Sequence, residues 1–128
     1  MSRDTANRIP FGVQPYKVYV ALLTQASSAA PTAAVLEDSL GALLTFARTS
    51  AGIYTVTSDN AILVANKTLV FCWQINNASN DRVYVVSHLR TSTTIITINT
   101  KFQDAAASGG QPADDVLSET PFEIRVYQ

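Results

Sequence analysis

The sequence predicts an all-β domain, an antiparallel β-sandwich of the immunoglobulin-like or jelly-roll-like kind, with about seven or eight short strands. Short runs rich in Val, Ile, Thr, Tyr and Phe recur along the chain, and turn-forming residues separate them. No helices alternate with these runs, as a parallel sheet would require. At 128 residues, the chain is one domain by length and can bury roughly two thirds of the surface of its unfolded form. A small barrel is the alternative architecture.

The first element is an extended arm at residues 1–14, MSRDTANRIPFGVQ, where charged residues mix with Pro10 and Gly12 without periodicity. A single domain follows at residues 15–128. We expect its strands, each five to eight residues long, at Tyr16–Leu23, Ala33–Glu37, Ala42–Arg48, Ile53–Ser58, Leu69–Ile75, Arg82–Leu89, Thr94–Asn99 and Phe122–Tyr127.

Two connections contain residues typical of turns. The stretch TAAVLEDSLGALL contains helix formers, but Gly41 would interrupt a helix. We therefore favour a hairpin that turns at Glu37 to Gly41 over a short helix. Between the fifth and sixth strands, Asn and Asp residues tolerate left-handed backbone and bond their own chain. They predict a second hairpin, with the turn residues Asn76, Asn77, Asn80 and Asp81.

A longer connection runs from Thr100 to Pro121 and contains Gly109, Gly110 and Pro112. A segment of this length without secondary structure is unusual inside a compact domain. We therefore interpret residues 100–121 as a long loop that either has a function at the surface or is disordered.

The stretch TPFEIRVYQ at residues 120–128 alternates apolar and polar side chains with the period of a half-buried strand. Burial of each of its three alternating apolar residues stabilises the fold by about 1.5 to 3 kcal/mol. We therefore expect an integral sheet strand beside Tyr16–Leu23. The apolar residues are Phe122, Ile124 and Val126. Opposite charges are then expected to meet among Lys17, Glu37, Glu123 and Arg125.

The charge and apolar content of the chain exclude some classes of partner. Charged residues make up 15% of the chain, the net charge is −1 and the pI is about 5.6. The basic field with which proteins bind nucleic acid is therefore missing. The start MSRDTANRIP has no apolar signal region, and no apolar run approaches the roughly 18 residues of a membrane span. We expect no nucleic-acid or membrane partner, and synthesis in a cytoplasm without an obvious export signal.

Few residues are available for chemistry. His88 is the only histidine and Cys72 the only cysteine, too few for a nucleophile with its base or for a zinc site. We interpret Cys72, in the apolar run LVFCW, as a buried structural thiol, and His88 as a solvated or interface residue. Asp114 and Asp115 are interpreted as solvated loop acids, with weak calcium binding as the alternative. No catalytic, cofactor or metal site is predicted, and the protein is expected not to be an enzyme.

The stretch SAGIYTV, residues 50–56, resembles the tyrosine corner of immunoglobulin-like sandwiches, where a Gly precedes a Tyr that opens a core strand. Tyr54 would anchor this corner, and Val56 stands where immunoglobulin domains place a Cys. An ordinary Gly-containing turn before a strand is the alternative.

Two predicted strands are apolar on both faces. Tyr16–Leu23 has apolar or aromatic residues on each side, and LVFCWQI at residues 69–75 shows the same pattern. In an antiparallel domain such strands need a second cover, and this short chain has little material for a third layer. We therefore predict a homo-oligomer, either a dimer or a trimer. Cover by the arm and the 100–121 loop is the alternative.

Three phrases together resemble a small β domain in structural proteins of tailed bacteriophages that infect Bacteroidetes, the crAss-like group included. The phrases are PYKVYVALLTQ, AAPTAAVLEDSLGALLTFARTSAGIYTVTS and TPFEIRVYQ. The shared elements are a YKVY strand, a following Gln25, a VLE-x-x-LG turn, an aromatic strand, an R-T-S-x-G-x-Y corner and a closing strand. The resemblance covers the first half of the chain and the last nine residues, and it says little about residues 60–119.

This resemblance implies a non-enzymatic virion protein that decorates or reinforces the capsid or forms part of a head fibre. Its partners would be itself, the major capsid protein or other virion proteins, and its location the virion. We expect the arm to bind neighbours through Arg3, Arg8, Ile9 and Phe11. The alternative is a module on a phage fibre or tail that binds carbohydrate or a host surface through aromatic side chains. The candidates are Trp73, Tyr84 and Tyr127.

Overall fold

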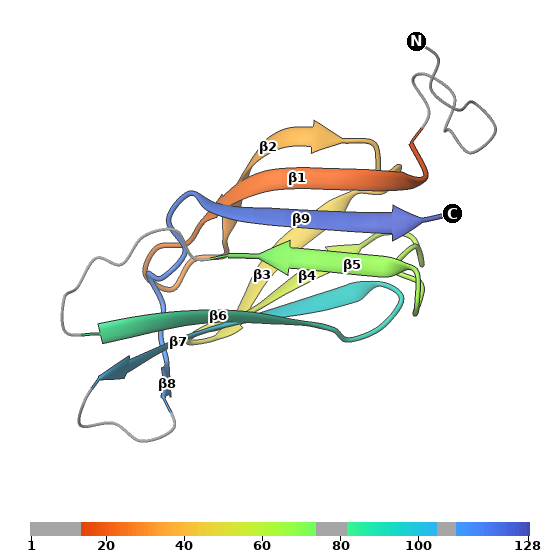
Figure 1. Ribbon diagram of the computed structural model, residues 1–128. Helices are drawn as coiled ribbons and strands as arrows, with labels where there is room; N and C mark the ends of the chain where they lie inside the picture. Colours follow the sequence, from red (N-terminus) through yellow and green to blue (C-terminus); the bar gives the residue numbers. More distant parts are fainter. Residues whose placement is uncertain (1–13, 74–81, 105–109) are drawn as a thin grey trace, which may run out of the picture.

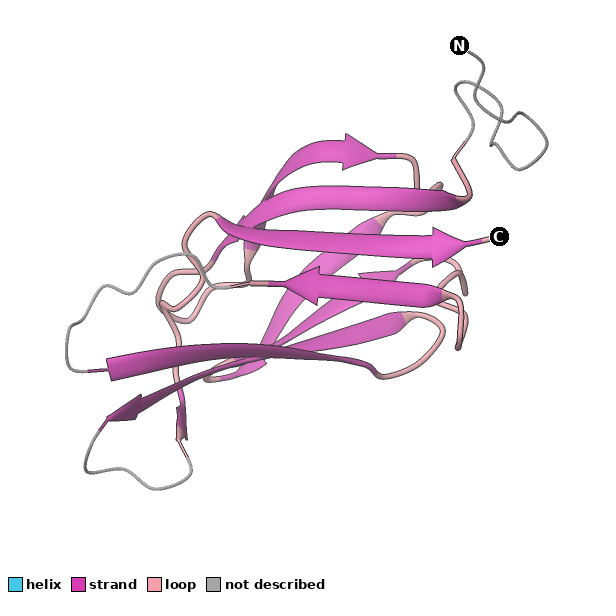
Figure 2. Ribbon diagram, viewed as in Figure 1, coloured by secondary structure: helices cyan, strands magenta, loops and turns pink. Residues whose placement is uncertain are grey.

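The computed structural model describes residues 14–73, 82–104 and 110–128, and the regular secondary structure in these ranges is all strand. Two antiparallel sheets pack together (Figures 1 and 2), which confirms the predicted β-sandwich. Sheet A contains, in spatial order, β2 (Thr32–Asp38), β1 (Tyr16–Thr24), β9 (Thr120–Tyr127) and β5 (Thr68–Cys72). Sheet B contains β3 (Leu44–Ser50), β4 (Ile53–Ser58), β7 (Ile95–Asp104) and β6 (Arg82–Arg90), and the short β8 (Gln111–Pro112) pairs with β7.

Apolar side chains that alternate along the inner strands fill the space between the sheets. Phe122 of β9 is 1% exposed, and its ring meets those of Tyr19 and Phe46 edge-on at centroid distances of 6.3 Å. Such aromatic pairs add about 0.5 to 1.5 kcal/mol to the effect of burial itself. The other buried members of this core are Ala21, Leu23, Leu40, Tyr54, Val56, Leu63, Cys72, Ile96, Ile98, Leu117 and Ile124.

The strand β9 lies inside sheet A, between β1 and β5. Its pairing with β1 runs from Tyr16 opposite Tyr127 to Leu23 opposite Thr120, and β5 pairs with its other edge. The predicted placement beside Tyr16–Leu23 is confirmed. Phe122 and Ile124 are fully buried, and Val126 packs against the core at its edge.

The ion pairs predicted across these strands are wrong. Lys17 lies opposite Val126, so it is on the core side of the sheet, whereas Glu123 and Arg125 point to the opposite side. Glu37 lies opposite Val20 and forms no ion pair with a described residue. Glu123 instead pairs with Arg125 on its own strand.

The hairpin predicted at Glu37 to Gly41 is also wrong. β2 pairs with β1 in sheet A and β3 pairs with β4 in sheet B, so the connection carries the chain from one sheet to the other. Leu40 within it is 2% exposed and belongs to the core. A tight hairpin turn would have left this side chain in solvent.

The second predicted hairpin fails for the same reason. β5 pairs with β9 and β6 pairs with β7, so the two strands belong to different sheets. The residues predicted to form its turn lie outside the described residues, namely Asn76, Asn77, Asn80 and Asp81.

The connection predicted as a long loop at 100–121 contains more structure than expected. β7 extends to Asp104, and β8 adds a short pairing with it. Val116 and Leu117 are buried at 5% and 1% exposure. The Leu117 carbonyl accepts a hydrogen bond of 3.0 Å from the Gln25 N–H, so this part of the connection is packed against the start of the β1–β2 turn.

Candidate interaction surface

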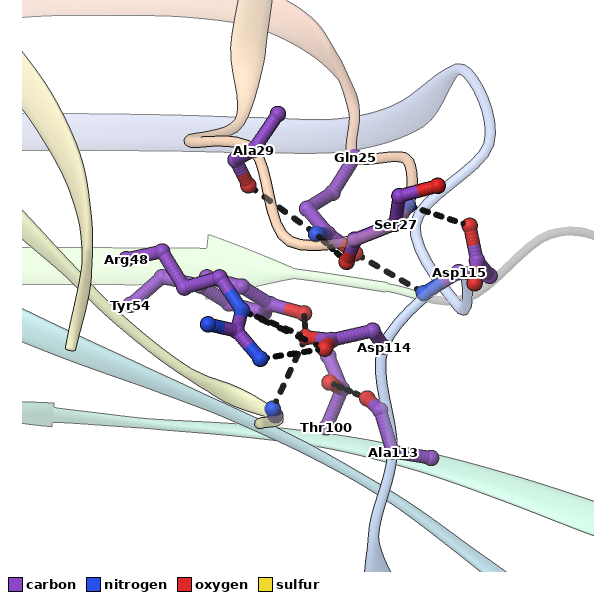
Figure 3. Close-up of polar contacts among 10 residues, drawn as sticks. Gln25, Ser27, Ala29, Arg48, Tyr54, Thr100, Ala113, Asp114 and Asp115 are labelled. Atoms are coloured by element: carbon purple, nitrogen blue, oxygen red, sulfur yellow. Dashed lines mark hydrogen bonds and ion pairs between the residues drawn. The ribbon is translucent and has the colours of Figure 1, made fainter. Parts of the chain in front are cut away.

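A partly buried polar cluster is centred on the carboxylate of Asp114, shortly after β8 (Figure 3). Arg48 of β3 approaches this carboxylate with two nitrogens: Nη2 lies 2.7 Å from Oδ2, and Nε lies 3.2 Å from each oxygen. The Gly52 N–H and the Tyr54 hydroxyl both donate to Oδ1, at 3.0 Å and 2.6 Å. Both carboxylate oxygens are therefore occupied by protein donors.

The electrostatics of this cluster fix its charges. Hydrogen bonds from Arg48 lower the pKa of Asp114 to about 2, against the opposing effect of burial. Burial, and then its hydrogen bond to the carboxylate, raise the pKa of Tyr54. Neither group can exchange a proton readily near neutral pH, where a general acid or base should have its pKa. The cluster is therefore a structural cross-link.

Asp114 is thus not the solvated loop acid that the sequence predicted. The neighbouring Asp115 is nearer to that description, because it accepts an exposed hydrogen bond of 2.7 Å from the Ser27 N–H. Its own N–H donates to Gln25 Oε1 at 2.8 Å (Figure 3). The described ranges hold no group of three or more His, Cys, Asp or Glu side chains that could bind a metal ion.

Tyr54 anchors the corner before β4, but not as the resemblance to immunoglobulin domains implied. There the hydroxyl bonds to backbone a few residues upstream, whereas here it bonds to the distant Asp114. Gly52 allows this arrangement. Its φ is +71°, and a Cβ at this position would lie 2.4 Å from the Thr100 carbonyl oxygen and 2.6 Å from the Ala113 nitrogen.

His88 lies on the edge strand β6, is exposed, and forms no hydrogen bond or ion pair with the described part of the chain. Partial burial of its ring lowers its pKa. A hollow of about 300 Å³ lies elsewhere, at the end of the sandwich where Lys17 and Gln128 meet. Its other lining residues include Leu40, Ile62 and Val126, and none is a His, Cys, Asp or Glu. The hollow is therefore lined by no imidazole, thiol or carboxylate side chain.

Cys72 is 4% exposed on the core side of β5, and burial raises its pKa to about 12. We expect the folded protein to resist a thiol-specific reagent such as DTNB at pH 8. Its thiolate fraction is about a thousandfold lower than that of an unfolded cysteine. Labelling should become rapid in concentrated urea. Rapid labelling in native buffer would contradict the buried position.

The outer face of sheet A is the second feature of interest. Its side chains point away from the core, and the strand register sets them in rows: Tyr16 lies beside Tyr127, and Glu123 lies between Val20 and Phe71. The face comprises Tyr16, Val18, Val20 and Leu22 of β1, Pro121, Glu123, Arg125 and Tyr127 of β9, and Leu69, Phe71 and Trp73 on and just after β5. It is predominantly apolar and aromatic.

The two charges of β9, in the middle of this face, neutralise each other. The guanidinium of Arg125 bonds to the carboxylate of Glu123 and lies 4.8 Å from the ring centroid of Tyr16 and 5.6 Å from that of Phe71. The bond to Glu123, followed by one to Tyr127, raises the pKa of Arg125. A planar guanidinium between aromatic rings presents a flat, weakly hydrated surface.

The outer face of sheet B differs in composition. The register places six hydroxyl or amide side chains there, together with five aliphatic ones and one lysine. Its residues are Thr45, Ala47, Ile53, Thr55, Thr57, Val85, Ser87, Leu89, Ile95, Thr97, Asn99 and Lys101. Aromatic rings occur on the outer face of sheet A but not among these residues.

Of the aromatic residues predicted to bind a ligand, the structure places two on one face, toward opposite ends of it: Trp73 beside Pro121 and Tyr127 beside Tyr16. Trp73, at 62% exposure, and Tyr127 lie on the outer face of sheet A. Tyr84 belongs to sheet B, opposite Phe102, and does not join them. The predicted arm residues lie outside the described residues, namely Arg3, Arg8, Ile9 and Phe11.

Sequence reasoning did not select the three residues at the centre of this face. Tyr16 and Phe71 lie in the strands predicted to be apolar on both faces. This pattern was the sequence signal that could have identified them. Nothing in the sequence indicated that Arg125 would lie between their rings, because the three side chains come from three different strands.

Comparisons with family models, with curated proteins and with solved structures find no match to this chain. Within the described ranges there is no helix with the length and apolar character needed to span a membrane.

Proposed function

We propose that this protein is a non-enzymatic structural component of a bacteriophage virion, which decorates or reinforces the capsid or forms part of a head fibre. The observation that carries this proposal is the outer face of sheet A, which carries four aromatic rings, whereas the described residues on the outer face of sheet B include none. Exposed apolar faces of this extent mark surfaces that bind other proteins. The assignment to a virion rests on the resemblance of the segments that form β1, the β2–β4 region and β9 to structural proteins of tailed bacteriophages.

The polar cluster supports the same function class. Its strongest acid, Asp114, has both oxygens bonded by protein donors, and His88 has no partner among the described residues. Buried apolar area, not a reaction centre, is then the means by which the protein acts, and its effect is mechanical. Its partners would be copies of itself, the major capsid protein or other virion proteins.

Location on the particle tests this proposal. Mass spectrometry of purified virions from an infected host should detect the protein in many copies, and antibody labelling in electron microscopy should place it on the head. Absence from purified virions would contradict the proposal.

Removal of residues 1–14 tests the role predicted for the arm. We expect the shortened chain to fold with an unchanged melting temperature, because the described strands begin at Tyr16, but to bind capsids lacking the protein less tightly. Cosedimentation with such capsids measures this binding, and full-length protein is the control. Undiminished binding would contradict the role of the arm.

Carbohydrate or host-surface binding on a fibre or tail is the second candidate function. It is favoured by the exposure of Trp73, whose ring meets that of Phe71 at a centroid distance of 5.9 Å. Aromatic faces of this kind stack on sugars, but recognition also needs free polar groups beside them. Glu123 and Arg125 are already bonded to each other, so the face fits a protein partner better.

A further inference from the structure

We infer that the outer face of sheet A binds the same face of a second copy of this chain, as a two-fold symmetric dimer. This inference rests on the proposed function of the protein as an assembly component and names the partner of its apolar face. The two outer faces of one molecule provide an internal comparison: both belong to antiparallel sheets, but among the described residues aromatic side chains occur on that of sheet A and not on that of sheet B.

Charge complementarity favours a second copy as the partner. Glu123 and Arg125 lie two residues apart on the same face of β9. A two-fold axis between them brings each Glu123 towards the partner's Arg125, so the opposed faces attract each other at their centre. A face with a single sign of charge would instead repel its own copy.

The size of the face is sufficient for a dimer. Sheet A has four strands when β2 is counted, whose Glu37 lies opposite Val20 at the edge of the face. At a spacing of about 4.8 Å, with β9 about 26 Å long, they give an area of about 500 Å² per copy. The total of about 1,000 Å² reaches the lower limit for a specific interface. Flat sheet faces pack in this way inside β-sandwiches, at a separation of about 10 Å.

The residue types on this face are those that dominate binding energy at interfaces. Tyr, Trp and Arg are enriched among such residues, particularly beside hollows that a partner side chain can fill. A hollow of about 50 Å³ lies between Val20, Phe71, Trp73 and Pro121. Trp73 at its border is the most exposed aromatic side chain on the face.

The single tryptophan of the chain makes the inference directly measurable. Because Trp73 is 62% exposed in one copy, its fluorescence should shift to shorter wavelength as the protein associates and return on dilution. Analytical ultracentrifugation over the same concentrations should show the change from monomer to dimer. A monomer throughout, at concentrations up to about 100 µM, would overturn the inference.

Matched variants on the two sheets distinguish loss of this interface from the general effect of removing an exposed apolar side chain. Leu69 on sheet A and Val85 on sheet B are 46% and 44% exposed. Trp73 and Leu89 match in the same way, at 62% and 61%. We expect Leu69→Thr or Trp73→Ser to weaken dimerisation at least tenfold, whereas Val85→Thr or Leu89→Ser changes it less than twofold.

Equal effects of the two sets of variants would overturn the inference, provided that circular dichroism shows all four to be folded. A charge exchange adds a test of symmetry: Arg125→Glu alone should weaken dimerisation, and Glu123→Arg added to it should restore association. Failure of the double variant to recover would overturn the two-fold arrangement.

The outcomes distinguish this inference from the proposed function. A dimer with these properties that is absent from virions would support the inference and contradict the proposed function. A protein that is found in virions but stays monomeric in solution would support the proposed function and contradict the inference. A glycan from an array that shifts the fluorescence of Trp73 while the protein remains a monomer would assign the face to sugar binding and overturn the dimer.

Discussion

A chain that ends at Pro121 should not unfold cooperatively. The truncation removes Phe122, Ile124 and Val126, whose burial stabilises the fold by about 5 to 8 kcal/mol in total. This is comparable with the whole net stability of a typical domain, about 5 to 15 kcal/mol. It also leaves β1 and β5 without the strand that joins them. Circular dichroism during urea titration should show a broad, non-sigmoidal change.

A chain that lacks only Gln128 is the matched control. The backbone N–H of Gln128 makes one hydrogen bond, to the Pro15 carbonyl, so this control should retain a sharp transition. Phe122→Ala gives a graded version of the experiment. We expect it to lower the free energy of unfolding by about 3 to 5 kcal/mol. A sharp two-state transition in the chain ending at Pro121 would show that β9 is dispensable.

Replacement of Asp114 should be the most damaging single change to a polar residue. Asp114→Ala removes the acceptor for Arg48, Gly52 and Tyr54 together. Tyr54 has no exposed surface, so its hydroxyl loses the carboxylate acceptor inside the fold. We expect the free energy of unfolding to fall by about 3 kcal/mol. Asp115→Asn, at the next residue, keeps an acceptor for Ser27 and should cost less than about 0.5 kcal/mol.

The contribution of Asp114 should also depend on pH in a defined direction. Its pKa is 3.8 ordinarily and about 2 in the fold, so the unfolded chain takes up the proton first as the pH falls. The stabilisation is therefore complete above about pH 5 and is lost progressively between about pH 5 and pH 1. Urea denaturation of wild type and Asp114→Asn measures this. Their difference in unfolding free energy should be large at pH 7 and much smaller at pH 2.5, and a constant difference would contradict the carboxylate's role.

Strand positions could be predicted because they depend on local pattern. Ile53–Ser58 was predicted with the bounds that the structure shows, and Tyr16–Leu23 differs from β1 by one residue. Period-two alternation is a property of the strand itself. Pairing is not local, since a turn such as Glu37 to Gly41 can either fold a hairpin or carry the chain to the other sheet. The buried Leu40 decides between these possibilities, and its burial depends on the rest of the core.

The polar cluster could not be predicted for a related reason. Asp114 lies sixty or more residues along the chain from Arg48, Gly52 and Tyr54. In sequence it looks like any acid in a Gly- and Pro-containing connection. The centre of the outer face of sheet A combines β1, β5 and β9 in the same way. Sequence reasoning identified the excess of apolar residues on these strands, but not which rings would surround Arg125.

The pairing of β1 with β9 has a consequence for the order of events during synthesis. Every other strand of the fold lies between these two in the chain, and loop closure over such a distance is slow. β3 and β4 of sheet B pair through a short turn and can form earlier. The outer face of sheet A exists only once β9 has joined it, so a nascent or prematurely terminated chain lacks the surface by which we propose that copies associate. On this proposal, assembly would be restricted to chains that have been translated through Tyr127.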